Sequence, residues 1–342
     1  MSLTSDLEAH GGEVATEHLE GDASKIAGRS PSQLAWARFR SDKLSMISFF
    51  ITIFIVLCAI SAPILVATKV LEPNKFNQKL LVNDGVSPGG RFGGVSWDHP
   101  LGLEPSTGRD LLSRLMYAMT WSLGIGLSAA LLTIVIGVVL GIMSGFSGGL
   151  VDATVGRFID LTLSFPQTMM LLALSAPAVQ LLQHQVADWH GFGLLHDRDR
   201  ANGLYVVLIL AIFGWPPIAR VVRGQVLSIR EREYIEAARL MGASRRRLYF
   251  KEVLPNVWAP ILVFFTLLVP AYISAEAAFN FLGVGIKPPT PTLGNILADS
   301  VSYTSADPTY FLLPGLLLAL TVVVFNLVGD GARDALDPKT NR

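Results

Sequence analysis

The chain has 342 residues, of which 51% are hydrophobic and only 16% are charged, and its 27 basic and 27 acidic residues give a formal net charge of zero. A soluble domain carries about 25% charged residues, so the deficit indicates a membrane protein. The balanced charge gives no argument for nucleic-acid binding. The single cysteine, Cys58, excludes an intrachain disulfide and a cysteine-based metal cluster.

The N-terminal residues are polar and precede the first apolar run. We expect residues 1–33 to form a disordered cytoplasmic tail, because they include few large apolar side chains. Residues 34–45 combine Trp36, Arg38 and Lys43 in a short amphipathic lead-in, which we expect at the inner membrane surface. The polar lead is too long for a cleaved signal peptide.

Six uncharged runs are close to or above the roughly 20 residues that a helix needs to cross the hydrocarbon core. They contain 23, 37, 27, 19, 23 and 22 residues and span Met46–Thr68, Leu115–Val151, Leu161–Ala187, Ala201–Ala219, Val253–Ala275 and Pro308–Gly329. Lipid leaves open backbone groups without hydrogen-bond partners, so these runs must be helical. The sequence therefore predicts an all-α membrane protein with six transmembrane helices.

The distribution of basic residues predicts the orientation. Segment Arg220–Lys251, between the fourth and fifth runs, holds nine Lys and Arg residues. With the N-terminus inside, cytoplasmic segments hold 18 of the 27 Lys and Arg residues. The positive-inside rule then places both termini and loop 223–256 in the cytoplasm, and loop 69–114 outside.

A second external insertion, His184–Gly203, contains several potential metal ligands. These are His184, His190, His196, Asp188, Asp197 and Asp199. Three histidines at six-residue spacing match no helical face and no standard ligand pattern, so we interpret the insertion as a solvated loop and predict no metal site.

The second run carries glycines at every fourth position. Gly137, Gly141 and Gly145 form a small-residue face of the kind that lets membrane helices approach closely. We expect close packing there, and the face would suit a heterodimer interface.

Loop Glu233–Asn256, which reads EYIEAARLMGASRRRLYFKEVLPN, predicts two short helices at a bend. Good helix formers fill Arg232–Met241, Gly242 suits a left-handed C-cap, and Ser244 can cap a second helix that runs to Pro255. A modest apolar stripe consists of Tyr234, Ile235, Ala238 and Met241. The result is a small knob with a charged rim.

The order Glu236-Ala237-Ala238, Gly242 and Leu254-Pro255 resembles the EAA loop of bacterial ABC import permeases. In that family the loop forms coupling helices that dock on the ATPase subunits. The resemblance implies ATPase-coupling roles for Tyr234, Glu236, Ala237, Ala238, Gly242, Ala243, Arg246, Leu254 and Pro255. The alternative is a basic amphipathic helix that rests on anionic lipid.

Three further stretches resemble the peptide and nickel permease group of the same family. They are His99–Gly102 with Gly108–Arg114, Phe281–Gly285 with Pro288–Pro291, and Asn326–Gly331 with Arg333–Pro338. We interpret Arg109 and Arg114 as interfacial anchors. The combined resemblance implies the C-type permease of a dipeptide or oligopeptide ABC importer, with a type I ABC importer permease fold and a core at 115–338.

Polar residues inside the runs are candidates for the substrate pathway. Glu276 interrupts the fifth run and Asn280 follows one turn later. A buried carboxylate is costly in a membrane, so it faces protein or water. Glu276 could meet the ammonium end of a peptide, or pair within the helix bundle.

The sequence contains no G-x-x-x-x-G-K-[ST] phosphate loop and no catalytic constellation, so we predict no enzymatic activity for this chain. The resemblance implies a second homologous permease, two ATP-binding subunits that hold ATP and Mg²⁺, and an extracytoplasmic peptide-binding protein, all at a prokaryotic cytoplasmic membrane. Nickel or glutathione is an alternative cargo. An ATP-independent secondary transporter is the alternative class, disfavoured because only Glu276 is a mid-run acid and no internal repeat is visible.

Overall fold

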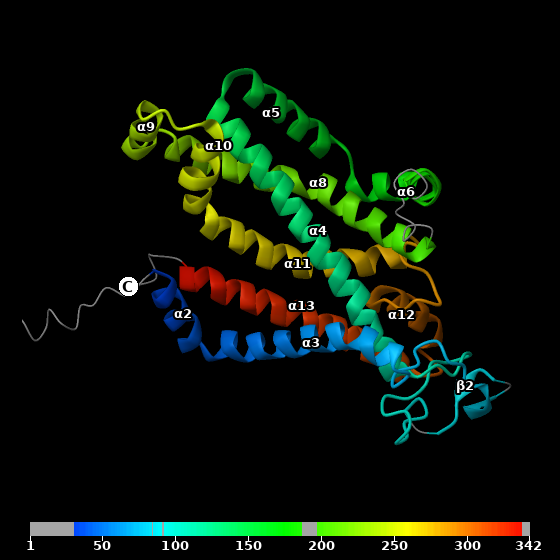
Figure 1. Cartoon of the computed structure of the whole chain (residues 1–342). Coiled ribbons are helices and arrows are strands. Elements are labelled where there is room, and N and C mark those ends of the chain that lie inside the picture. The colour runs from blue at the N-terminus through cyan, green and yellow to red at the C-terminus, as the bar shows by residue number, and fades with distance from the viewer. Residues whose placement is uncertain (1–30, 84, 91, 187–196, 337–342) are drawn as a thin grey trace, which may run out of the picture.

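The computed structural model describes residues 31–83, 85–90, 92–186 and 197–336, and most of them are helical (Figure 1). All but the last three residues of the expected tail, 1–33, lie outside this part of the chain. The amphipathic lead-in forms helix α2, Pro31–Ser41, which is separated from α3, Lys43–Ala67, by Asp42. The Asp42 carboxylate caps α3 by accepting the backbone N–H groups of Leu44 and Ser45, at 3.1 and 3.2 Å.

Within the described residues, five helices are long and apolar enough to cross a membrane. They are α3 and α4 (Leu111–Ser147), α8 (Arg198–Ile229), α11 (Trp258–Phe281) and α13 (Pro308–Leu336). Helix α4 begins at Asp110, whose carboxylate accepts the Ser113 N–H at 2.8 Å, and ends at Gly148, where φ is +64°. These five correspond to the first, second, fourth, fifth and sixth predicted spans.

The third predicted span is wrong as a single straight helix. Run 161–187 is divided between α5, Gly149–Ser164, and α6, Gln167–Leu181, and the pair is bent by 86°. The bend lies at Phe165, whose φ and ψ of −94° and 131° are extended, because Pro166 disfavours the helical conformation in the residue before it. The count of spans is therefore five, or six if this bent pair crosses as one.

The remaining elements of the described residues are short. They are η1 (Gln78–Leu80), the antiparallel strands β1 (Leu81–Val82) and β2 (Ser87–Pro88), η2 (Leu182–Val186), α9 (Glu233–Leu240), α10 (Arg245–Arg247), η4 (Leu248–Val253), η5 (Leu254–Asn256), α12 (Leu293–Ser300) and η6 (Val301–Tyr303).

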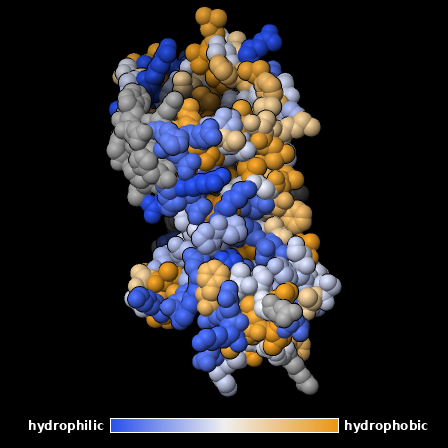
Figure 2. Space-filling view, turned by 90° about the vertical axis from the view of Figure 1, so that its right-hand side faces the viewer, coloured by the Kyte–Doolittle hydropathy of each residue, from blue (hydrophilic) through white to orange (hydrophobic). Residues whose placement is uncertain are grey.

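The long helices give the molecule two distinct ends (Figure 1). At one, which we call the connector end, α2 and the last turns of α13 lie on the same side of the bundle as α9 and α10. At the other, the hairpin end, lie β1, β2, α12 and α6. Figure 2 looks onto the hairpin end and shows hydrophilic residues across its centre, with hydrophobic residues along one edge.

Helices α4 and α8 pack closely because glycines remove side chains from their contact. A Cβ atom added to Gly137, Gly141 or Gly145 would lie within 2.8–2.9 Å of Ile218, Val222 or Val226, respectively. The predicted close packing is confirmed, but the suggested heterodimer interface is wrong. The face that these glycines expose is already covered by α8 of the same chain.

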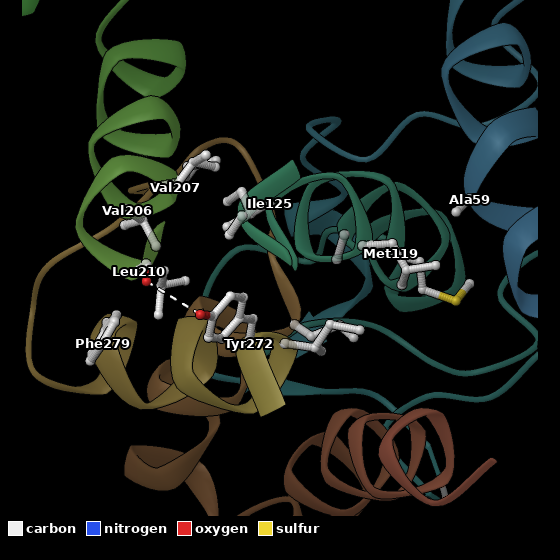
Figure 3. Packing of buried hydrophobic residues seen from close by; sticks show 14 of the residues in the cluster. Ala59, Met119, Ile125, Val206, Val207, Leu210, Tyr272 and Phe279 are labelled. Carbon is white, nitrogen blue, oxygen red and sulfur yellow. Dashed lines mark hydrogen bonds between the residues drawn. The ribbon is translucent and has the colours of Figure 1, made fainter. Parts of the chain in front are cut away.

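A continuous apolar core joins α4, α8 and α11 (Figure 3). Ile125 of α4, Val206 of α8, and Tyr272 and Phe279 of α11 belong to this core. The Tyr272 hydroxyl lies 3.3 Å from the Leu210 carbonyl oxygen and 3.1 Å from Thr133 Oγ1, so its polar atom is satisfied inside the bundle.

We expect Gly141→Val to destabilise the chain by about 1–3 kcal/mol, because its side chain would push apart two close-packed helices. The measurement is the thermal unfolding midpoint of the purified chain in detergent. Gly124→Val in the same helix is the matched control, since an added Cβ there meets nothing within 4 Å. Equal midpoints for the two variants would contradict the packing role of Gly141.

Candidate functional sites at the two ends of the bundle

The first site is the connector between α8 and α11, residues 230–257, which forms two short helices at a bend. Helix α9 ends in a Schellman motif: the Gly242 N–H donates to the Arg239 carbonyl at 2.9 Å and the Ala243 N–H donates to the Ala238 carbonyl at 3.0 Å. Gly242 has a φ of +79°, as predicted for a left-handed cap. Ser244 Oγ then accepts the Arg247 N–H at 3.4 Å and starts α10.

The inner face of the connector is buried against the ends of α4 and α8. Ile235, Val253 and Val257 join Ile142 and Val226 in one apolar cluster. At its edge, the Arg239 guanidinium lies 4.6 Å from the centroid of the Phe146 ring, and Tyr249 Oη lies 2.9 Å from Ser147 Oγ. The connector is thus a packed extension of the bundle.

The outer face is exposed and carries large apolar side chains. Leu240 and Met241 are 84% and 78% exposed, and Tyr234 and Phe250 are also exposed. The four residues of the predicted apolar stripe therefore do not lie on one face, and that prediction is wrong. Ile235 and Ala238 face the bundle, whereas Tyr234 and Met241 face away from it, leaving an apolar surface with a charged rim at the connector end.

The structure brings most of the nine predicted coupling residues to this outer surface. Exposed are Tyr234, Glu236, Ala237, Gly242, Arg246 and Pro255; Ala243 and Leu254 are half-buried; Ala238 is buried. Ala238 therefore supports the connector from within.

Ion pairs brace α8 where the connector begins. The Arg223 guanidinium donates to both Asp152 carboxylate oxygens, each at 2.6 Å, and so joins α8 to α5 in a bidentate pair. Arg230 Nη1 donates to the Gly145 carbonyl oxygen at 3.1 Å. Ser144 adds a further hydrogen bond to Asp152. Polar contacts therefore continue the glycine-lined α4–α8 contact up to the connector.

The second site is the pair predicted for a substrate pathway. Glu276 is 1% exposed, and its Oε2 accepts the Ser122 hydroxyl at 2.9 Å. The Ser122 Oγ in turn accepts the Leu293 N–H at 3.1 Å, at the start of α12. Asn280 donates its side-chain amide to the Glu276 backbone carbonyl at 3.0 Å and to its carboxylate. The pair therefore links α11 to α4 and α12 inside the chain.

A second buried carboxylate, Glu104, joins the segment between α3 and α4 to the bundle. Glu104 is 1% exposed and forms an ion pair with Arg109, and its Oε2 lies 3.5 Å from Arg114 Nε. The Tyr310 hydroxyl lies 2.7 Å from Glu104 Oε1 and 2.9 Å from Asp299 Oδ2. Burial opposes ionisation, but Arg114, Arg109 and Thr107 together hold the pKa of Glu104 below its ordinary value.

Arg109 and Arg114 are therefore not interfacial anchors, and that interpretation is corrected. Arg114 is 2% exposed and donates Nη1 to the carbonyls of Pro73 and Pro289, both at 3.3 Å. Sequence reasoning missed Glu104, Asp299 and Tyr310. The two arginines could have pointed to Glu104. A buried cation needs a carboxylate partner, and Glu104 stands five residues before Arg109 in the sequence.

In the described residues no group of three or more His, Cys, Asp or Glu side chains is placed to hold a metal ion. His184, Asp197 and Asp199 of the external insertion are described, whereas Asp188, His190 and His196 lie outside the described residues.

These features define a multi-span helical membrane protein with a packed helical connector at one end, whose outer face is exposed. Residues 137–342 match the family model "Binding-protein-dependent transport system inner membrane component", and residues 30–80 match "N-terminal TM domain of oligopeptide transport permease C". The chain belongs to the binding-protein-dependent transport system inner membrane component family, and is a permease subunit of an ABC transporter of the inner membrane.

Several curated relatives match over most of their length. The oligopeptide transport system permease protein OppC of Bacillus subtilis (strain 168) is 34% identical over 94% of this chain and 95% of its own. The dipeptide transport system permease protein DppC of the same organism is 33% identical over 95% and 91%. OppC of Mycobacterium tuberculosis (strain ATCC 25618 / H37Rv) is 39% identical over 68% and 73%.

Among solved structures, the MetNI methionine ABC transporter in an inward-facing conformation is similar at 18% identity. The match has a TM-score of 0.49 and covers 66% of this chain and 98% of that one.

We expect Glu104→Gln to destabilise the chain at neutral pH by about 3–5 kcal/mol, because two buried guanidinium groups lose their carboxylate. The folded-state pKa of Glu104 is lowered from 4.5, so its contribution is complete above about pH 4.5 and is lost as pH falls through the folded-state pKa. Unfolding midpoints of the two proteins should therefore converge as the pH falls below 4.5.

Glu72→Gln is the control for this prediction, because Glu72 forms an exposed pair with Lys75 and exposed pairs contribute about 0–1 kcal/mol. The stabilising role of Glu104 is wrong if Glu104→Gln and Glu72→Gln unfold at the same temperature at pH 7.

Proposed function

We propose that this chain is one of two permease subunits of an ATP-driven importer of short peptides. The observation that carries the proposal is the similarity to oligopeptide and dipeptide permeases along more than nine-tenths of the chain. Its cargo is inferred from those relatives' names, and its partners are inferred from its membership of the family. The partners are a second homologous permease, two ATPases that bind ATP and Mg²⁺, and an extracytoplasmic peptide-binding protein.

In this proposal the connector is the surface that receives the ATPase. Two features support it: the outer face is exposed and apolar at Leu240 and Met241, and the inner face is packed on α4 and α8. A rigid element transmits displacement better than a mobile loop does. Glu236 and Arg246 would lie on the rim of the contact, where charge determines which partner is accepted.

The proposal places the connector end in the cytoplasm. Segment Arg220–Lys251 holds nine basic residues, which favours that side under the positive-inside rule. The start of α2 and the last turns of α13 lie at the same end of the bundle (Figure 1). The hairpin end would then face the binding protein.

In this proposal Glu276 and Asn280 hold α11 against α4 and α12, and they do not contact the transported peptide. The contacts of Glu276 with Ser122 and Asn280 favour pairing within the bundle over direct contact with a peptide ammonium group. If α12 moved relative to α4, the hydrogen bonds of Ser122 to Glu276 and to the Leu293 N–H would have to break, or α11 would have to move as well.

We expect a tag on this chain to recover the complex from its native membrane in mild detergent. Mass spectrometry of the purified material should identify a second permease and two ATPases, and reconstituted vesicles should import peptide only with ATP. The proposal fails if the chain purifies alone and moves solute without ATP. If the vesicles take up nickel or glutathione with ATP and take up no peptide, the ATP-driven importer is retained and the peptide cargo is wrong.

We expect Glu236→Arg to reduce ATP-driven uptake about tenfold or more, because a charge of the wrong sign at the contact creates like-charge repulsion that costs on the order of several kcal/mol. Uptake is measured in reconstituted vesicles at equal protein level. Glu233→Arg is the matched control: both acids lie exposed in the first turn of α9, so both changes remove the same favourable helix-dipole interaction. Wild-type uptake in Glu236→Arg would refute the coupling role.

A further inference from the structure

A polar hollow of about 460 Å³ lies at the hairpin end, between α6, η2, the first turn of α8 and the loop that follows α11. Its polar lining includes Gln180, Gln183, His184, Arg198, Asn202 and Lys287. Hydrophilic residues cover the centre of this end of the molecule (Figure 2). The volume falls in the range of small-ligand sites, about 300–1,000 Å³.

Among the described residues, the lining of this hollow is positively charged. Arg198 and Lys287 contribute to it, and no carboxylate of the described residues does. Arg198 stands at the first position of α8, where the helix dipole adds positive potential. The adjacent Asp197 is engaged elsewhere: it caps α8 through the Asp199 N–H at 3.0 Å, and its Oδ2 lies 3.6 Å from Arg200 Nε. A carboxylate ligand would therefore meet attraction from the walls.

The hollow lies one layer outside the Glu276–Asn280 pair. Its wall includes Gly285, where φ is +135° and an added Cβ would lie 2.6 Å from Asn280 Oδ1. Asn280 is in turn bonded to Glu276, which is sealed inside the bundle. A solute that arrives at the hairpin end would therefore meet Arg198 and Lys287, and Glu276 would not contact it.

We propose that this hollow binds the C-terminal carboxylate of a short peptide. Arg198 and Lys287 donate charge-assisted hydrogen bonds to the carboxylate. The amides of Gln180, Gln183 and Asn202 both donate and accept, as the peptide backbone requires. This assignment rests on the proposed function, because the ligand class comes from the peptide cargo.

Saturation-transfer NMR on the tag-purified complex in nanodiscs, without binding protein, tests the assignment. Trialanine should bind, and trialanine amide should bind about tenfold more weakly, since the amide lacks the carboxylate that accepts charge-assisted hydrogen bonds. Lys287→Gln and Arg198→Gln should each weaken trialanine binding by a similar factor, and Lys287→Arg should retain it. Arg200→Gln is the matched control, because Arg200 pairs with Asp197 and is not part of the lining.

Equal binding of trialanine and its amide would overturn the assignment, and so would an equal loss in Arg200→Gln. It is also overturned if Lys287→Gln and Arg198→Gln bind trialanine normally but lose stimulation of ATP hydrolysis by the binding protein, since the hollow would then be a protein-docking surface. Peptide import by a complex that shows no binding here removes this assignment and leaves the proposed function intact. A complex that imports no peptide removes the proposed function itself.

Discussion

The close contact of α4 with α8 is the constraint on which the rest of the structure depends. Three glycines, one per turn, allow Ile218, Val222 and Val226 to reach the α4 backbone. Lipid supplies no hydrophobic drive between helices, so van der Waals contact at this distance holds the pair together. The same apolar seam continues into Ile235 and Val253 of the connector. The position of the connector is therefore set by the pair that forms the centre of the bundle.

At the hairpin end, buried polar clusters hold the helices together, as close packing does at the connector end. Glu276 joins α11 to α4 through Ser122, and Ser122 also accepts the first N–H of α12. Glu104 holds Arg109 and Arg114 and contacts Tyr310 of α13. Removing the Glu104 carboxylate leaves two buried guanidinium groups without a counter-charge, which costs more than the ion pair itself contributes. Each cluster thereby makes one arrangement of α11, α12 and α13 much more favourable than its alternatives.

The sequence predicted most of the helical architecture because length and apolar composition determine membrane spans almost alone. It also predicted the connector, since Gly242 and Ser244 act locally as helix caps and need no distant partner. Two kinds of feature were out of reach. The bend at Phe165 follows from the local effect of Pro166, whereas the uncharged run around it indicated one continuous helix. The partner of the glycine face and the role of Glu104 depend on which distant segments meet, and composition carries no information about that.

Helix α4 contacts both candidate sites, and it does so at its opposite ends. Its 37 residues extend about 55 Å at 1.5 Å per residue. Near its first turns it holds Arg114 and Ser122, and near its last turns it holds Gly145, Phe146 and Ser147. A helix fixed at both ends moves as a rod, so a displacement of the connector also moves Ser122. Glu276 and the first turn of α12 would then have to follow or lose their hydrogen bonds. On the proposed function, this link gives the ATPase-facing surface a mechanical route to the opposite end of the pathway.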